Sequence, residues 1–239
     1  MVIFLKGLKQ KNKKMIKIGH RGALGYEPEN TLLSFQRAIS LSVDMIELDV
    51  YACKTGDLVV IHDDRLERTT NGNGYIWEKT IEELRNLDAG KGQKIPTLME
   101  VLNLVDKKTQ VNIELKGEGT AKPVAETIAS YISQNGWNEG MFLVSSFNHQ
   151  ELKKFKELMP DIRTGALITA IPQDYAKFGQ DLNAWSVNLC IEFINQTFVD
   201  DAHDRGLKVL VWTVNHPEDI QRMKSLGVDG IFSNFPDRI

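Results

Sequence analysis

The stretch Met45-Ile46-Glu47-Leu48-Asp49-Val50 decides the fold of this chain. It is a short apolar run that two carboxylates interrupt, as in a buried strand. Side chains alternate between the two sides of a strand, so Glu47 and Asp49 point in the same direction. The stretch therefore predicts a strand that presents a pair of acids on one side.

On both sides of this stretch, short β-branched runs alternate with amphipathic segments, which is typical of parallel strands joined by helical crossovers. The predicted strands are Met15–Gly19, Met45–Val50, Gln110–Leu115, Met141–Ser145, Arg163–Leu167, Ala184–Leu189, Lys208–Val214 and Gly230–Ser233. The predicted helices are Thr31–Leu41, Thr97–Val105, Ala121–Ser133, Asn148–Leu158, Asp174–Phe178, Gln196–Arg205 and Glu218–Leu226. Asn30 and Asn148 stand before two of these helices, while Pro217 opens and Gly227 closes the last one.

Eight strands with helical crossovers in 239 residues predict an α/β protein, a single (β/α)8 barrel domain over residues 1–239. An open doubly wound sheet is the alternative, but Gly19-His20-Arg21-Gly22 lacks the spacing of its nucleotide-binding turn. Residues 57–95 break the rhythm with an extra strand at Leu58–Ile61, a polar loop and a small helix near Ile81–Leu87. A small insertion after the second strand is therefore expected.

The composition points to a small-molecule partner. Hydrophobic residues make up 42% and charged residues 26% of the chain, and the formal net charge is −3. A chain with this balance has no broad basic face that would hold nucleic acid or anionic lipid. We therefore expect neither a nucleic-acid partner nor stable membrane insertion.

The N-terminus and the two cysteines predict a cytoplasmic protein. An apolar patch at Val2–Leu5 precedes the lysines, which is the reverse of the order in a secretory signal. The lysines, Lys6, Lys9, Lys11, Lys13 and Lys14, fit a solvated terminus better than a membrane contact. Cys53 and Cys190 are interpreted as small hydrophobic residues in a reducing compartment, and the sequence leaves open whether they form a disulfide.

The carboxyl ends of the predicted strands hold the acids that could bind a metal. Catalytic groups of (β/α)8 barrels cluster at these ends. Glu47, Asp49 and Glu114 would place three oxygen donors together, a set suited to Mg2+ or Ca2+ because a cation relieves their mutual repulsion. The alternative is that these acids form structural ion pairs with Arg21 and Lys116.

Two histidines and two cations stand at the same strand ends. His20 and His62 each follow an apolar run, where an imidazole can serve as acid or base near neutral pH. They could instead be metal ligands, as in amidohydrolase-type barrels, although the His-x-His pair of those enzymes is missing here. Arg21 and Lys116 indicate an anionic substrate, unless they only pair with Glu27 or Glu29.

Taken in order, these residues resemble one family. The matching motifs run from about Lys17 to the C-terminus: His20-Arg21-Gly22, Pro28-Glu29-Asn30-Thr31, Glu47-Leu48-Asp49-Val50, His62-Asp63, Arg68-Thr69-Thr70, Glu114-Leu115-Lys116, Ser146-Phe147, Trp212-Thr213-Val214-Asn215 and Asp229 to Pro236. The ordered set looks like the signature of the glycerophosphodiester phosphodiesterases, in their small bacterial cytoplasmic form. The chain departs from the usual pattern at Cys53-Lys54-Thr55 and Ser42-Val43-Asp44.

The resemblance implies a (β/α)8 barrel with an insertion at about residues 57–94. It also implies hydrolysis of glycerophosphodiesters to sn-glycerol 3-phosphate and an alcohol, with the glycerol 2-hydroxyl as first nucleophile. By motif, Glu47, Asp49 and Glu114 hold one divalent metal ion, and His20 and His62 act as base and acid in an order that stays open. Arg21 and Lys116 match phosphate-contacting positions, Glu29 a supporting acid and Trp212 an aromatic residue of the pocket.

Three other functions are weighed against this one. An aldolase-like barrel would use Lys116 as a Schiff base, which leaves the histidines unexplained. A non-catalytic phosphate-binding barrel would normally have lost a catalytic group. Relatives that act on lysophospholipids need an apolar entry, and the aromatic residues that could form one are Trp77, Phe147, Phe193, Trp212 and Phe235. A monomer or homodimer is expected, and the headgroup is left open.

Overall fold

The computed structural model describes residues 14–239, so the lysine-rich segment up to Lys13 lies outside the described residues. Its strands are β1 (Ile16–Gly19), β2 (Met45–Ala52), β3 (Leu58–Val60), β4 (Gln110–Leu115), β5 (Phe142–Ser146), β6 (Arg163–Ile168), β7 (Ser186–Cys190), β8 (Lys208–Trp212) and β9 (Gly230–Ser233). Its α-helices are α1 (Leu32–Ser40), α2 (Ile81–Asn86), α3 (Leu98–Val105), α4 (Ala121–Asn135), α5 (His149–Leu158), α6 (Lys177–Asp181), α7 (Gln196–Asp204) and α8 (Pro217–Leu226). Short 3-10 turns are η1 (Ile76–Glu78), η2 (Glu139–Met141), η3 (Ile191–Phe193) and η4 (Pro236–Arg238).

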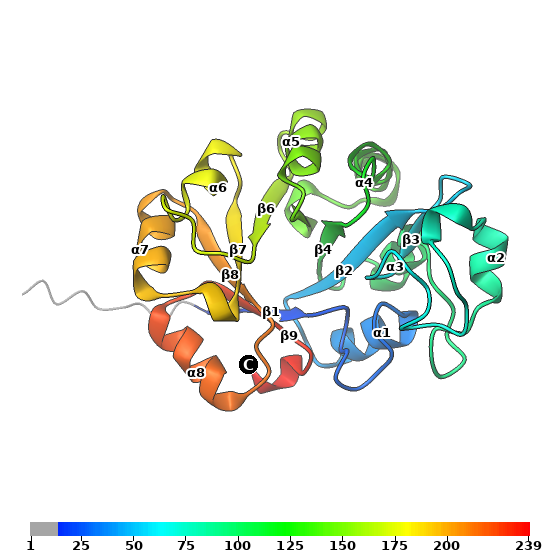
Figure 1. The fold of residues 1–239 in the computed structure, drawn as a ribbon, viewed down its shortest axis with the longest axis horizontal. Helices are drawn as coiled ribbons and strands as arrows, with labels where there is room; N and C mark the ends of the chain where they lie inside the picture. The colour runs from blue at the N-terminus through cyan, green and yellow to red at the C-terminus, as the bar shows by residue number, and fades with distance from the viewer. Residues whose placement is uncertain (1–13) are drawn as a thin grey trace, which may run out of the picture.

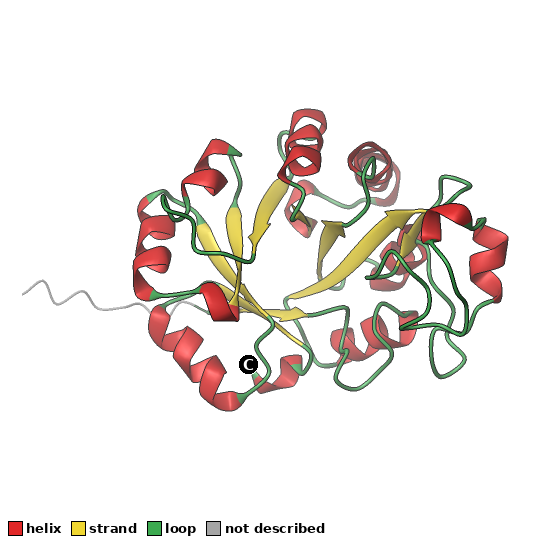
Figure 2. Ribbon diagram, viewed as in Figure 1, coloured by secondary structure: helices red, strands yellow, loops and turns green. Residues whose placement is uncertain are grey.

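The strands close into a barrel. Neighbours follow the order β1, β9, β8, β7, β6, β5, β4, β2, and a further pairing between β1 and β2 joins the two ends. Each of these pairs is parallel, whereas β3 adds to β2 in antiparallel orientation. Helices surround the strands from outside (Figures 1 and 2). The predicted (β/α)8 barrel is confirmed, and the open doubly wound sheet is excluded because its edges would stay apart.

Two layers of apolar packing hold the barrel together. Large aromatic residues such as Phe35, Phe142 and Phe155 are fully buried between the strands and the surrounding helices. Inside the barrel a smaller cluster contains Ile18, Met45, Leu143, Leu210 and Phe232. Because side chains fill the interior of a barrel of this size, the polar groups at the carboxyl ends of the strands lie on an apolar base.

Between β2 and α3 the chain leaves the barrel. This insertion (residues 57–94) contains β3, η1 and α2, and Figure 1 shows α2 outside the ring of helices. It has its own apolar cluster, which includes Leu66, Ile76 and Leu84. A capping box between Thr80 and Glu83 starts α2. The insertion matters for function because β3 leads directly to residues 62 and 63 and so places them at the mouth of the barrel.

Two predicted helix starts are wrong. Thr31, and not Asn30, caps α1, because the Thr31 side chain accepts the hydrogen bond from the Ser34 amide while Asn30 turns inward. Helix α6 begins at Lys177 rather than at Asp174, because Tyr175 has a φ of 44° and a left-handed residue cannot join an α-helix. Asn148 does cap α5, and Gly227 closes α8 in the left-handed conformation.

The structure also bears on the state of the two cysteines and on the expected absence of membrane insertion. Cys53 and Cys190 are both free, so the question of a disulfide between them is answered, and Cys53 is buried as a small hydrophobic residue. Within residues 14–239, every helix is too short or too polar to traverse a bilayer.

Candidate active site

A pocket opens at the carboxyl ends of the strands. It is lined by His20, Arg21, Glu47, His62, Asn112, Glu114, Ser145, Phe147, Leu167, Trp212 and Phe232. Strands β1, β2 and β4 are neighbours, so the motifs that follow or lie on them meet here although they are far apart in the sequence. Six of the nine site residues expected from sequence line the pocket directly, and Asp49, Glu29 and Lys116 contact residues that do.

Three buried carboxylates form the electronegative centre of the pocket. Asp49 on β2 is the register partner of Glu114 on β4, and Glu47 precedes Asp49 on the same side of β2. One oxygen from each of the three lies within 4.8 Å of the others. Burial, and then the charge of Asp49, raise the pKa of Glu47 well above its ordinary value and that of Glu114 to about 7. Such crowding favours a cation between them.

The alternative of structural ion pairs is only partly realised. Lys116 Nζ lies 3.1 Å from Glu114 Oε1, and Arg21 Nε lies 3.6 Å from Asp49 Oδ2. Within residues 14–239, however, Asp49 Oδ1 is buried without a hydrogen-bond partner. Two cations therefore face three carboxylates, and the carboxylates outnumber the cations that pair with them. This donor set fits a hard divalent ion with oxygen ligands.

His20 is held by the last strand of the barrel. Its Nδ1 lies 2.7 Å from the Asn234 side-chain oxygen, just after β9, and its backbone N–H donates to Ser233. An amide oxygen can only accept, so Nδ1 carries the proton and Nε2 keeps its lone pair. Burial, followed by the charge of Arg21, lowers the pKa of His20 to about 4. The ring is therefore neutral at pH 7 and can take up a proton.

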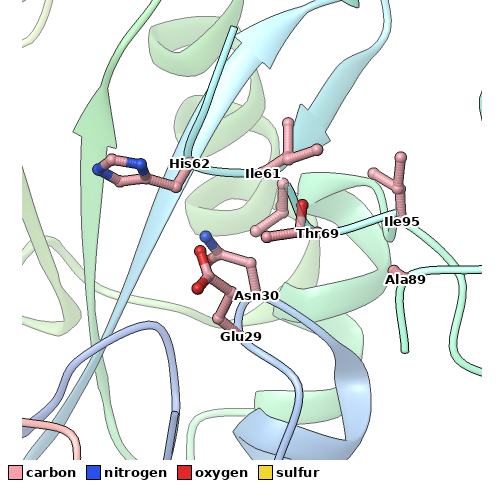
Figure 3. Close-up of a pocket in the computed structure, with 8 residues that line it drawn as sticks. Glu29, Asn30, Ile61, His62, Thr69, Ala89 and Ile95 are labelled. Atoms are coloured by element: carbon pink, nitrogen blue, oxygen red, sulfur yellow. The ribbon is translucent and has the colours of Figure 1, made fainter. Parts of the chain in front are cut away.

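His62 lines the same pocket and has a charged partner. Its Nδ1 is 2.5 Å from Asp63 Oδ1, and its Nε2 is 3.2 Å from Lys116 Nζ. Burial lowers its pKa, while Asp49 and Asp63 oppose the shift. In Figure 3 the His62 ring points away from Ala89 of the insertion and from Ile95, which follows it. The insertion thus delivers an imidazole whose protonated form a carboxylate can stabilise.

Arg21 is placed by a tight turn after β1. Its backbone N–H donates to Glu47 Oε2 at 2.7 Å, which requires a φ of 51° at Arg21. Its Nη1 donates to Glu29 Oε1 at 2.8 Å. Burial opposes ionisation of Glu29, but hydrogen bonds from Arg68 and the charge of Arg21 lower its pKa to about 2. Lys91 donates to Glu27 instead, so of the two acids named as alternative partners of Arg21 it is Glu29 that pairs with it.

The remaining wall of the pocket is aromatic. Phe147, after β5, meets Trp212 at the end of β8 edge to face, with ring centroids 5.4 Å apart. Lys116 Nζ lies 5.8 Å from the centroid of Phe147. The other aromatic residues considered above are elsewhere, since Trp77 stacks on a tyrosine of the insertion and Phe235 packs on Tyr26. Leu167 on β6 and Phe232 on β9 add to the apolar lining that Phe147 and Trp212 provide.

Sequence reasoning gave no site role to four residues that orient this centre. Asn30 Nδ2 donates to Asp49 Oδ2 at 2.8 Å, Asn234 and Asp63 orient the two histidines, and Arg68 bonds both Glu29 and Asp63. All four residues belong to the motifs quoted in the sequence analysis, so membership in those motifs could have identified them as site residues. Their partners lie 1 to 214 positions away, and most of these pairings depend on the fold.

Comparisons with known proteins agree with this geometry. Residues 20–238 match the sequence model of the Glycerophosphoryl diester phosphodiesterase family. A glycerophosphodiester phosphodiesterase of Caldanaerobacter subterraneus is 37% identical over 235 residues, which cover 95% of this chain and 96% of the relative. A human protein named lysophospholipase D is 26% identical, over 93% of this chain and 84% of its own length.

A solved structure gives the same picture in three dimensions. An Oleispira antarctica phosphodiesterase, solved in complex with the product sn-glycerol-3-phosphate, superposes with a TM-score of 0.86. The two chains are 33% identical, and the match covers 93% of this chain and 94% of the other. The likeness thus extends over nearly the full length of both chains.

Proposed function

The chain belongs to the glycerophosphoryl diester phosphodiesterase family, and on this premise we propose that it hydrolyses glycerophosphodiesters to sn-glycerol 3-phosphate and an alcohol. The observation that carries the proposal is the pocket itself, in which two histidines flank three buried carboxylates and two cations. The product named in the Oleispira antarctica structure supports the choice of substrate class.

Arg21 and Lys116 bind the phosphodiester. A phosphodiester carries negative charge that repels a nucleophile, so its hydrolysis needs positive charge next to the phosphoryl oxygens. The guanidinium of Arg21 is held by Glu29, and the charges of Glu114 and Asp49 raise the pKa of Lys116 although burial opposes them. Both groups are therefore charged at pH 7.

One divalent metal ion, Mg2+ or Ca2+, fits between Glu47, Asp49 and Glu114, where it would supply further positive charge to the phosphoryl oxygens. Asn30 keeps Asp49 turned toward that position through its amide hydrogen bond. The backbone N–H of Arg21 does the same for Glu47. These contacts leave other carboxylate oxygens free for the ion, among them Asp49 Oδ1.

His20 is the base of the first step and His62 the acid. His20 Nε2 removes the proton of the glycerol 2-hydroxyl, whose oxygen bonds to phosphorus. As the bond from phosphorus to the alcohol oxygen breaks, His62 donates a proton to that oxygen, and the alcohol leaves. This order is supported by the partners of the two histidines. His20 has a lowered pKa and lies beside an amide, so it is neutral and can accept a proton, whereas His62 lies beside a carboxylate that stabilises its protonated form.

The second step regenerates both histidines. His62, now neutral, removes a proton from water, whose oxygen bonds to phosphorus in the cyclic phosphate. The bond to the 2-oxygen breaks, and protonated His20 returns its proton to that oxygen. The sum is one water consumed and one phosphodiester bond cleaved.

The test is release of sn-glycerol 3-phosphate from glycerophosphocholine by protein purified without metal. We expect release only after Mg2+ or Ca2+ is added, and a loss of about 100-fold or more in His20→Ala. His216→Ala is the matched control, because His216 is exposed and outside the pocket. No release from any glycerophosphodiester with any divalent ion would disprove the proposal.

A second substrate class, the lysophospholipids, is favoured by the aromatic wall of the pocket. Phe147 and Trp212 give the pocket an apolar wall, and the human relative carries the name lysophospholipase D. A substrate panel that includes lysophosphatidylcholine measures this preference. A cytoplasmic location and a monomeric or homodimeric state stay predictions.

A further inference from the structure

One arginine of the insertion joins the two sides of the pocket. Arg68 donates from Nη1 and Nη2 to the two carboxylate oxygens of Glu29, both at 2.8 Å. From Nε it donates to Asp63 Oδ2 at 2.5 Å, and from Nη2 to Asp63 Oδ1 at 3.1 Å. Four hydrogen bonds thus fix one guanidinium between a carboxylate of the loop after β1 and one of the insertion.

Each of these carboxylates already holds a group that we place in the reaction. Asp63 Oδ1 contacts Nδ1 of His62, and Glu29 Oε1 accepts a bond from Arg21 Nη1. In Figure 3, Glu29 and His62 reach the same area from different segments of the chain. A continuous chain of hydrogen bonds therefore links the Arg21 guanidinium to the His62 imidazole. Its intermediate members are Glu29, Arg68 and Asp63.

We propose that Arg68 is a positioning residue that sets the orientation of His62 and Arg21 together. It makes no contact with the acidic centre, and its side chain is 48% exposed at the rim. A planar guanidinium can bond two carboxylates at once in fixed directions, which a lysine cannot do. The inference rests on the proposed function, because it presumes that His62 and Arg21 act on a phosphodiester.

The surrounding loop is held by contacts that do not involve the Arg68 side chain. Leu66 is buried, its N–H donates to the Gly74 carbonyl, and Thr70 Oγ1 donates to its carbonyl at 2.7 Å. The Asn71 N–H donates to the Asp88 carbonyl. These contacts anchor the segment on both sides of Arg68. Loss of the Arg68 side chain should thus loosen the two carboxylates and leave the insertion in place.

Arg65 offers a matched control three positions away. It is 50% exposed, pairs with Glu67 and lies over the Tyr75 ring at 4.6 Å, and contacts neither Glu29 nor Asp63. We expect Arg68→Ala to lower kcat with glycerophosphocholine about 10- to 100-fold and to raise KM, the range found when a supporting residue of a site is removed. Arg65→Ala should stay within about twofold of the wild type on both constants.

Two further readouts separate positioning from a general loss of structure. Misfolding lowers kcat by reducing the active fraction and leaves KM unchanged, whereas misplacement of Arg21 raises KM. Added guanidinium should restore part of the activity of Arg68→Ala but none of that of His62→Ala, because only the first leaves an open guanidinium site. Arg68→Ala with wild-type kcat and KM, or without rescue, overturns the proposal.

Failure of the inference and of the proposed function are distinguishable. Activity in the wild type and in Arg65→Ala establishes the function whatever Arg68→Ala does. If the wild type is inactive, the side-chain 15N resonances of His62 still test the geometry. They should shift in Arg68→Ala and not in Arg65→Ala, and identical spectra would overturn the positioning role.

Discussion

Asp49 and Glu114 face each other across adjacent parallel strands, as register partners on β2 and β4. Their carboxylates, with that of Glu47, lie within 4.8 Å in a buried site. Like charges at this distance disfavour ionisation, so three ionised carboxylates in this site are electrostatically costly, and a cation bound among them removes the cost. The behaviour of the metal-free protein follows from this relationship.

The contribution of Glu114 to the stability of the metal-free protein should fall as the pH rises from about 4.5 to about 7, opposite in sign to the contribution of His20, whose pKa burial lowers to about 4. The pKa of Glu114 is raised from 4.5 to about 7 by burial and then by Asp49, so the folded state binds its proton more tightly than the unfolded state does. Stability from this group is fully present below the unfolded pKa and is lost as the pH passes the folded value. Thermal unfolding in the presence of a chelator measures the slope. The difference in Tm between the wild type and Glu114→Gln isolates this contribution and should change across this pH range, and a constant difference would contradict the prediction.

Mg2+ or Ca2+ should raise Tm at pH 7.5, because an ion that binds only the folded state stabilises it by mass action. Glu114→Gln removes one charged ligand and should abolish most of this rise. Glu118→Gln is the control, since Glu118 is exposed in the loop after the same strand. Equal metal-induced shifts in both variants would argue against the three-carboxylate site.

Leaving-group chemistry distinguishes the two histidines. An alcohol such as choline needs a proton to leave, whereas p-nitrophenolate does not. We expect His62→Ala to lose about 100-fold or more with glycerophosphocholine, but less than about tenfold with a p-nitrophenyl glycerophosphodiester. His20→Ala should be impaired on both, because the base is needed in either case. The reverse pattern would exchange the roles of His20 and His62.

The pH profile should report the partner of His20. Burial and Arg21 lower the pKa of His20 to about 4, so with saturating metal kcat/KM should hold down to about pH 5. In Asn234→Asp a carboxylate would face Nδ1 and stabilise the protonated ring, which raises the pKa. The acid limb of kcat/KM should then move to higher pH. The pH profiles of kcat/KM for the wild type and for Asn234→Asp measure this shift. Acid limbs that coincide in the two proteins would count against His20 as the base.

Gly22 tests the turn that places Arg21. Its φ is 85°, and an added Cβ would lie 2.4 Å from Ser34 Oγ and 2.6 Å from the Ser34 carbonyl carbon. Gly56 has a similar φ of 89° with open space around it. Gly56→Ala should therefore cost about 1 kcal/mol for backbone strain, and Gly22→Ala more, because the clash adds to it. Urea unfolding of the two variants measures the difference in their free energies of unfolding. Equal losses of stability would show that Ser34 moves aside without cost.

Much of the site could be predicted from sequence because its residues follow local rules. The period of two in β2 places Glu47 and Asp49 on one side, and parallel strands carry their functional groups at one end. His20, Arg21 and Glu114 follow from this rule, whereas His62 stands after β3, which is antiparallel to β2. The start of α1 was misjudged for a local reason as well, since Thr31 and Asn30 are both good caps and only one can serve.

What only the tertiary structure decided is which distant groups hold the site in place. Asn234 reaches His20 because β9 pairs with β1, and Arg68 reaches Glu29 because the insertion contacts the loop after β1. Such pairings depend on loop conformations and strand register, which periodicity does not encode. The sequence by itself determined the chemical groups and the end of the barrel where they gather. Barrel closure and insertion packing determined their partners, because hydrogen bonds over tens or hundreds of residues form only after the backbone has brought those segments together.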